Sequence, residues 1–156
     1  RELPAGDWFD VLPYVDLDRH VVKGDWARDG DSITVTPRAH CGVMLPVRLE
    51  GNYELEVEFT RHRGENAVSV LIPVGPGECR VCLSSKGVSG LANVNGQSID
   101  RNATASRAFT IVNGNRYQAV IRVGSIGAAA VVQVSVDGQP VIDDHGGALC
   151  IACHRK

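Results

Sequence analysis

An antiparallel β-sandwich is the fold class that this sequence predicts, and three observations lead to it. Short runs of β-forming residues alternate between apolar and polar side chains. Turn-forming pairs such as Asn95-Gly96, Asn113-Gly114 and Asp137-Gly138 separate these runs. No window shows the 3.6-residue period of the helices that connect parallel strands. We therefore expect an all-β protein built from two stacked antiparallel sheets.

Each predicted strand is a run of β-forming residues bounded by turn residues. Asp29-Gly30 precedes the first run, Glu50-Gly51 precedes the third, and Gly75-Pro76-Gly77 separates the fourth from the fifth. After the last run, Asp137-Gly138 turns the chain into QPVI, which is typical of a hairpin. Residues 87–106 lack a clear pattern and should hold one short strand and a loop. The predicted strands are SITVT (32–36), GVMLPV (42–47), YELEVEFT (53–60), AVSVLIPV (67–74), CRVCLS (79–84), RYQAVIRV (116–123) and AVVQVSV (130–136).

The alternation also assigns side chains to the two faces of each strand, because successive residues point to opposite faces. In RYQAVIRV, Gln118 and Arg122 share the outer face, and in AVVQVSV the outer residues are Gln133 and Ser135. The side chains expected between the sheets are Leu55, Val57, Phe59, Val68, Val70, Tyr117, Ile121, Val132 and Val134.

Length, charge and composition limit the classes of function. The chain of 156 residues is long enough for one domain with a sizeable core, so we expect a single β-sandwich domain over residues 1–156. A formal charge of -2, with scattered basic residues, argues against a nucleic-acid surface. No apolar run reaches the length of a membrane-spanning helix, so no membrane partner is expected. Residue 1 is Arg, not Met, so a fragment of a larger protein and secretion both stay open, and the compartment is unknown.

Five cysteines cannot all pair within one chain, and the odd number mildly favours a reducing compartment. Cys79 and Cys82 lie three positions apart in a predicted strand, about 10 Å from each other and on opposite faces. We therefore expect both to be reduced and unligated, since neither a shared zinc ion nor a disulfide fits that geometry. Cys150-x-x-Cys153-His154 has the spelling of a c-type haem attachment, but a haem also needs a helical pocket and usually a second axial ligand, neither of which the sequence indicates. Whether this motif has a role stays open. We expect no metal and no cofactor.

The run YELEVEFT places Glu54, Glu56 and Glu58 on one face of a strand. Adjacent members are about 6.6 Å apart at Cα, which is compatible with the carboxyl separation of a retaining glycosidase. The simpler interpretation is that the three glutamates form the solvent face of a half-buried strand. Solvent then keeps them ionised, whereas a general acid is normally kept protonated by burial.

The order of these segments resembles a known superfamily. Gly24-Asp25-Trp26, GNYELEVEFTR, AVSVLIPVG, NGNRYQAVIRV and VSVDGQPV follow one another as in the concanavalin A-like and laminin G-like jelly-roll domains. The chain is most similar to bacterial domains related to the 3-keto-disaccharide hydrolases, over roughly residues 8–143. The resemblance implies a jelly-roll sandwich, a fold that carries lectins, hydrolases and interaction modules alike. In glucanases of this shape, a strand reading roughly Glu-x-Asp-x-Glu supplies the catalytic acids, and Glu54, Glu56 and Glu58 match its spacing.

Two tryptophans and one polar turn are the remaining candidate functional residues. Trp8 and Trp26 are expected to pack in the core, with a sugar-stacking platform as the alternative. Residues 143–147, DDHGG, could hold Ca²⁺ or move a proton through Asp143, Asp144 and His145, but a polar turn is the simpler interpretation.

The leading interpretation is a non-catalytic ligand-binding or interaction module of a larger protein, with a carbohydrate or a protein as its ligand. Glu54, Glu56, Glu58 and Trp26 are the candidate ligand-binding residues. The alternative is a glycoside hydrolase-like enzyme that acts on a glucan or keto-disaccharide and uses the same three glutamates. A third interpretation is a structural accessory domain without a ligand.

Overall fold

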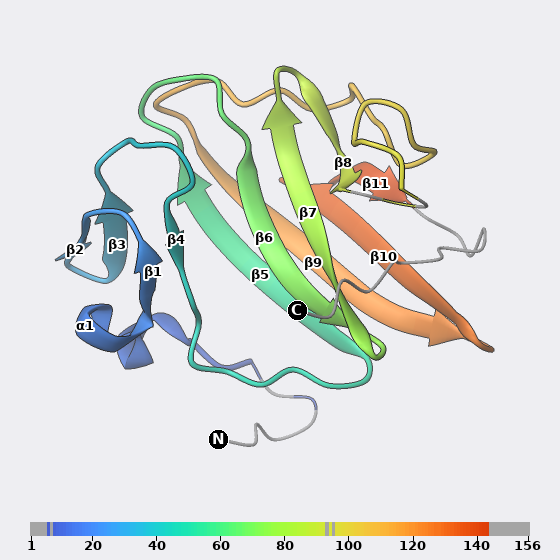
Figure 1. Cartoon of the computed structure of the whole chain (residues 1–156), viewed down its shortest axis with the longest axis horizontal. Helices are drawn as coiled ribbons and strands as arrows, with labels where there is room; N and C mark the ends of the chain where they lie inside the picture. The colour runs from blue at the N-terminus through green and yellow to red at the C-terminus, as the bar shows by residue number, and fades with distance from the viewer. Residues whose placement is uncertain (1–5, 7, 93, 95, 144–156) are drawn as a thin grey trace. The chain divides into compact units, whose positions relative to one another are not determined.

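The computed structural model describes residue 6, residues 8–92, residue 94 and residues 96–143, and Figure 1 traces the chain. The chain divides into two compact units, one over Arg1–Arg48 and the other over Leu49–Lys156. Nearly all the regular structure that is described consists of strands in antiparallel sheets. The all-β class predicted from the alternation is therefore confirmed.

The N-terminal unit combines two very short helices with two small antiparallel ladders. Asp16 begins the helix α1, where its carboxylate accepts a hydrogen bond from the Asp18 backbone N–H at 3.0 Å. Strand β1 pairs with β4, and β2 pairs with β3. Val15 is the one buried side chain among the described residues of this unit. The elements are η1 (Leu12–Tyr14), α1 (Leu17–His20), β1 (Val21–Lys23), β2 (Trp26–Asp29), β3 (Ser32–Val35) and β4 (Gly42–Val43).

Strand β4 is shorter than the strand predicted over residues 42–47. The sequence GVMLPV contains Pro46, which has no backbone N–H to contribute to a ladder. The Val47 N–H turns back to the Leu45 carbonyl at 2.8 Å, so the chain bends where the prediction extended it. The prediction followed the β-forming residues and gave the proline too little weight.

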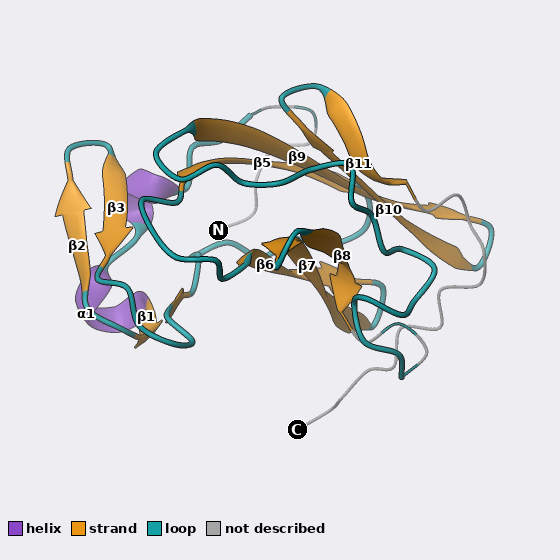
Figure 2. Cartoon of the chain, turned by 90° about the horizontal axis from the view of Figure 1, so that it is seen from above, coloured by secondary structure: helices purple, strands orange, loops and turns teal. Residues whose placement is uncertain are grey.

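The C-terminal unit consists of two antiparallel sheets that face each other as two layers (Figure 2). One sheet has the strand order β11-β10-β9-β5, and the other has the order β6-β7-β8. The predicted strands in this unit are confirmed to within three residues at each end, and β8 is the short strand expected within residues 87–106. The strands are β5 (Tyr53–Thr60), β6 (Val68–Val74), β7 (Gly77–Ser85), β8 (Val88–Ala92), β9 (Arg116–Ile126), β10 (Ala129–Val136) and β11 (Gln139–Asp143).

The hairpin predicted at Asp137-Gly138 joins β10 to β11. Val136 pairs with Gln139 across a two-residue turn. Both turn residues have positive φ angles, 48° for Asp137 and 79° for Gly138. Two positive φ angles match the type I′ turn, whose twist suits adjacent antiparallel strands, and aspartate followed by glycine is a favoured pair there.

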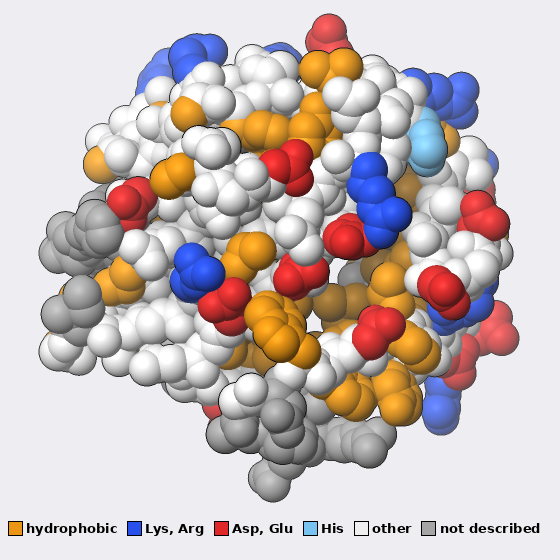
Figure 3. Space-filling model, turned by 180° about the vertical axis from the view of Figure 1, so that it is seen from behind, with side chains coloured by type: hydrophobic (Ala, Val, Ile, Leu, Met, Phe, Trp, Pro, Cys, Tyr) orange, Lys and Arg blue, Asp and Glu red, His pale blue; other side chains and the backbone are white. Residues whose placement is uncertain are grey.

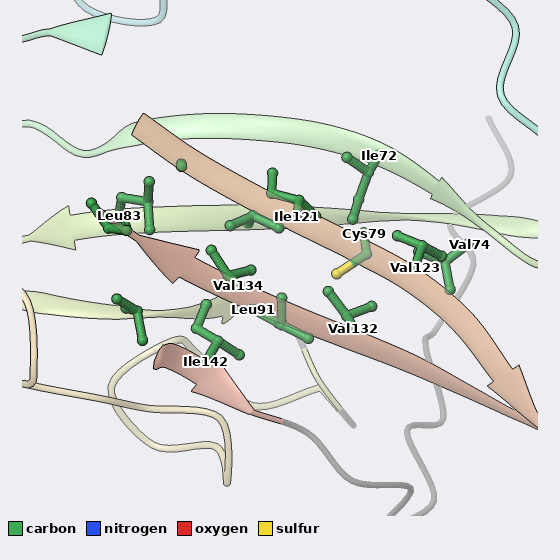
Figure 4. Close-up of a cluster of buried hydrophobic side chains, with 14 of the residues drawn as sticks. Ile72, Val74, Cys79, Leu83, Leu91, Ile121, Val123, Val132, Val134 and Ile142 are labelled. Atoms are coloured by element: carbon green, nitrogen blue, oxygen red, sulfur yellow. The ribbon is translucent and has the colours of Figure 1, made fainter. Parts of the chain in front are cut away.

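The core lies between the two sheets, and alternate residues of each strand build it (Figure 4). Among the predicted core residues, Ile121, Val132 and Val134 are at most 2% exposed. The inward side chains of β5 are only half-buried, although they keep the predicted phase. The predicted residues that are partly buried are Leu55, Val57, Phe59, Val68, Val70 and Tyr117.

The segment that follows β8 is fixed to that strand by a buried asparagine. Asn102 is 5% exposed, and its amide donates a hydrogen bond to the Leu91 carbonyl at 2.8 Å. Its carbonyl oxygen accepts hydrogen bonds from the backbone N–H and the hydroxyl of Thr104. The Thr104 hydroxyl oxygen in turn accepts from the Leu91 N–H at 2.9 Å. This network leaves little space above Gly90, where an added Cβ would lie 3.1 Å from Ile99 Cγ1.

Candidate functional site: the outer face of the four-stranded sheet

The three glutamates of β5 lie on the outer face of the four-stranded sheet. Glu54, Glu56 and Glu58 are exposed, while the residues between them are half-buried against the core. The exposure predicted from the alternation is therefore confirmed. Figure 3 views the molecule from this side and shows acidic and basic side chains lying next to one another.

Each of these carboxylates has a partner on the neighbouring strand β9. Glu54 accepts from Arg122 Nε at 2.9 Å and from its Nη2 at 3.5 Å. Glu56 accepts from the Gln118 amide at 2.6 Å, and Glu58 pairs with Arg116. Glu54 lies directly opposite Arg122, whereas Glu56 and Glu58 contact their diagonal neighbours Gln118 and Arg116. Both kinds of cross-strand pair occur on the solvent face of a sheet.

One end of this face is hollowed into a shallow, open depression of about 470 Å³. The residues that line it are mostly polar and include two valines: Asn52, Tyr53, Glu54, Arg122, Val123, Gly124, Ser125, Val131 and Gln133. Glu56 and Glu58 do not line it, so one of the three predicted glutamates belongs to the depression. Among the residues that line it, Tyr53 is the one aromatic, and its hydroxyl is bound to the Pro73 carbonyl at 2.5 Å.

Gly124 is one of the residues that line the depression. It lies in the regular part of β9, directly opposite Val131 of β10, and its backbone does not need a positive φ angle. A Cβ added at this position would meet only Asn52 Oδ1, at 3.9 Å. Sterics therefore do not require a glycine here. Glycine weakens a strand interior and is often found where a ligand or another backbone approaches closely.

The polar groups around Gly124 can both donate and accept hydrogen bonds. Arg122 and Glu54 form an ion pair whose side chains are 59% and 36% exposed, and such surface pairs contribute little stability. Gln133 donates to Asp143 Oδ1 at 3.0 Å, and its side-chain carbonyl oxygen is a hydrogen-bond acceptor. The opposite charges of the Arg122–Glu54 pair offset each other.

The two tryptophans lie in the N-terminal unit and differ in their surroundings. Trp26 begins β2 and is half-buried, and its indole N–H donates to the Lys23 carbonyl at 3.0 Å. Trp8 is 66% exposed, so the prediction that it packs in the core is wrong. Few apolar side chains in this unit are buried, so a core of the expected kind does not form around Trp8. A part for Trp26 in ligand binding stays a prediction.

Cys79 and Cys82 are reduced and lie on opposite faces of β7, as their spacing predicted. Cys79 belongs to the core cluster, whereas Cys82 lies outside it and accepts a hydrogen bond from Ser69. Burial, with a smaller contribution from Cys82, raises the pKa of the Cys79 thiol to about 11. A thiol that stays protonated is a poor nucleophile and a poor metal ligand.

Several predicted candidates lie outside the described residues. They include Asp144 and His145 of the polar turn and the Cys150-x-x-Cys153-His154 motif. Within the described part of the chain, no group of three His, Cys, Asp or Glu side chains gathers as a metal site. Asp143 ends β11 and accepts from Gln133.

Sequence reasoning missed the depression, although it placed most of its polar residues on the correct face. Arg122 and Gln133 were assigned outward by alternation, but no pattern indicated that they surround a hollow. Gly124 could have indicated the depression, because it lies two residues after Arg122 in β9 and therefore on the same outer face. A glycine in that phase leaves a gap between its cross-strand neighbours.

Comparisons with protein-family models, with curated proteins and with solved structures give no match for this chain. Among the described residues, no helix has both the length and the apolar character needed to cross a membrane. The fold and the outer face thus define an all-β protein with antiparallel sheets, a core between two of them, and a polar depression on one outer face.

Proposed function

We propose that this chain is a non-catalytic binding module and that the depression around Gly124 holds a neutral, polyhydroxylated ligand such as a glycan. The observation that carries the proposal is Gly124 itself, a residue without a side chain that lies in a regular strand and lines a polar hollow. Donor and acceptor groups of Arg122, Glu54 and Gln133 surround it, and such groups bind sugar hydroxyls. The absence of a free aromatic face in the lining predicts weak binding, with a Kd on the order of 1 mM.

The resemblance to concanavalin A-like jelly-roll domains supports the same class of function, because that superfamily includes lectins and interaction modules. We extend the proposal accordingly to a jelly-roll sandwich that acts as one module of a larger protein. The three glutamates favour binding over catalysis: all are exposed, Glu54 is paired with a cation, and Glu56 is bound to a neutral amide. A general acid normally depends on burial or a close carboxylate partner to stay protonated.

Gly124→Val tests the proposal with little risk to the fold. Valine suits a strand and there is space for its Cβ, so the variant should be as stable as the parent while its side chain fills the depression. The probes are short β-glucan oligosaccharides and keto-disaccharides, added to ¹⁵N-labelled protein. We expect amide resonances of β5, β9 and β10 near Gly124 to shift in the parent and to stay in place in the variant.

Arg80→Val on β7 is the matched control, since it introduces the same side chain at an exposed strand position of the other sheet. When the sugars are added, the amide resonances of Arg80→Val near Gly124 should shift as those of the parent do. The proposal fails if no sugar shifts these resonances in the parent. It also fails if the resonances of Gly124→Val shift as those of the parent do. If the parent hydrolyses a probe and Glu56→Gln or Glu58→Gln loses this activity, the chain is an enzyme and the proposed binding function is wrong.

A further inference from the structure

Strand β5 is the edge of the four-stranded sheet and has no partner on its outer side among the described strands. It pairs with β9 over all eight of its residues without a register shift. In an antiparallel sheet, alternate residues of an edge strand point their N–H and C=O groups away from the sheet. A long, regular edge of this kind is a template for another strand.

Natural edge strands usually carry a feature that prevents such pairing, such as a proline, a bulge or an inward charge. The edge strand β6 of the other sheet contains Pro73. Strand β5 contains no proline, no bulge and no inward charge. Its charged residues, Glu54, Glu56 and Glu58, all point outward.

The inward side chains of β5 are also incompletely covered. Leu55 and Phe59 are only half-buried, whereas Ile121, directly opposite Leu55 on β9, is 0% exposed. The difference follows from position, because Ile121 has strands on both sides and Leu55 has one. Another strand beside β5 would cover this apolar surface, and burial of apolar area favours association.

The charges on the outer face indicate what kind of strand fits. The partners of the three glutamates lie on β9, and the central one, Glu56, is bound only to the neutral amide of Gln118. An added strand would place its outward residues beside these carboxylates, where opposite charges stabilise the pair and like charges oppose it. A second copy of β5 would bring glutamates against glutamates, so self-pairing is disfavoured.

We infer that the free edge of β5 binds an extended segment of a partner protein in which basic and apolar residues alternate. The apolar residues of the partner segment cover Leu55 and Phe59, and its basic residues lie beside Glu56. Its backbone extends the four-stranded sheet by one strand. This recognition mode takes its affinity from main-chain hydrogen bonds and its specificity from alternate side chains. The site differs from the depression around Gly124, so either can exist without the other.

The probe is a fluorescein-labelled octapeptide of alternating lysine and valine, measured by fluorescence anisotropy with the full chain at about 0.15 M salt. A block peptide, four lysines followed by four valines, keeps charge and composition but loses the alternation. A third peptide carries N-methyl groups on alternate residues and loses main-chain donors. We expect both control peptides to bind at least about tenfold more weakly, since each loses several strand contacts.

Glu56→Gln should weaken binding of the alternating peptide by about two- to fivefold, as expected for one cross-strand charge pair. Glu78→Gln is the matched control, because Glu78 is exposed on β7 of the other sheet, and it should leave binding unchanged. Equal binding of the block peptide, or no binding at about 1 mM peptide, overturns the inference.

Two further measurements identify another occupant of the edge. If the β5 amides that point away from β9 are already protected from hydrogen exchange in the free protein, another segment of the chain covers the edge, and the inference fails. It also fails if sedimentation shows a dimer that dissociates when Leu55 is replaced by lysine, because a second copy then takes the place of the partner segment.

Discussion

Two acids in the C-terminal unit, the half-buried Tyr53 and the buried Cys79, link the stability of that unit to pH. Burial, with a smaller contribution from the Cys79 thiol, raises the pKa of Tyr53 from 10.0 to about 12. Burial, followed by the influence of Cys82, raises the pKa of Cys79 from 9.0 to about 11. In each case the folded protein holds a proton that the unfolded chain has already released at the same pH.

The free energy of unfolding should therefore fall at alkaline pH. Below about pH 9 both groups are protonated in both states, so their contribution is complete there. Between about pH 9 and 12 the unfolded chain ionises first, and stability declines as the pH rises. Urea unfolding of the parent, Cys79→Ala and Tyr53→Phe across this range measures the effect.

Cys79→Ala should lessen the decline from about pH 9 to 11, and Tyr53→Phe should lessen it from about pH 10 to 12. Each variant will also lose a constant amount of stability, through a smaller core side chain or the missing hydrogen bond to Pro73. The slope of the free energy of unfolding against pH is therefore the quantity to compare. Parallel curves for the parent and both variants would contradict the link between burial and titration.

At the scale of the strands, two glycines within β-strands have opposite surroundings. Gly90 of β8 is enclosed, and an added Cβ would lie 3.2 Å from both the carbonyl and the hydroxyl oxygen of Thr104. Gly124 of β9 is open, and its nearest neighbour would be 3.9 Å away. Neither residue needs a positive φ angle, so the two sites differ in space rather than in backbone conformation.

We expect Gly90→Ala to destabilise the protein by about 1 to 3 kcal/mol, because the network around Asn102 and Thr104 must shift to admit the methyl group. Gly124→Ala should be neutral or stabilise it by up to about 1 kcal/mol, since alanine restricts the unfolded chain. Urea midpoints of both variants give the comparison. If Gly90→Ala is the more stable of the two, the described packing around Thr104 is wrong.

For the whole molecule, the two units differ in how much apolar surface each buries. Among the described residues of the N-terminal unit, Val15 alone is buried, whereas the C-terminal unit holds a continuous core between its two sheets. Regions with few buried apolar contacts open locally at low free energy. The N-terminal unit should therefore be the less protected part of the native chain.

Limited trypsin digestion of the full chain measures this difference. We expect the first cuts after exposed basic residues of the N-terminal unit, such as Lys23 and Arg38, and a product that contains residues 49–156 should accumulate. Arg63 and Arg107 provide an internal comparison, because they are exposed residues of the C-terminal unit outside its strands. First cuts at those two positions would show that the better-packed unit opens earlier.

The sequence by itself determined the all-β class, the bounds of most strands and the face on which each side chain lies. These properties follow from local chemistry, since turn residues end strands and a period of two separates faces. Glu54, Glu56 and Glu58 were placed outward for this reason, and Cys79 was separated from Cys82.

The tertiary structure decided what alternation cannot express, namely which strand lies beside which and how completely a face is covered. Leu55 and Ile121 occupy the same phase of their strands, yet only Ile121 is fully buried, because β9 lies inside the sheet and β5 lies at its edge. The depression likewise depends on the register that sets Gly124 opposite Val131 and beside Asn52. Register and strand order join residues far apart in the chain, so no local pattern of the sequence specifies them.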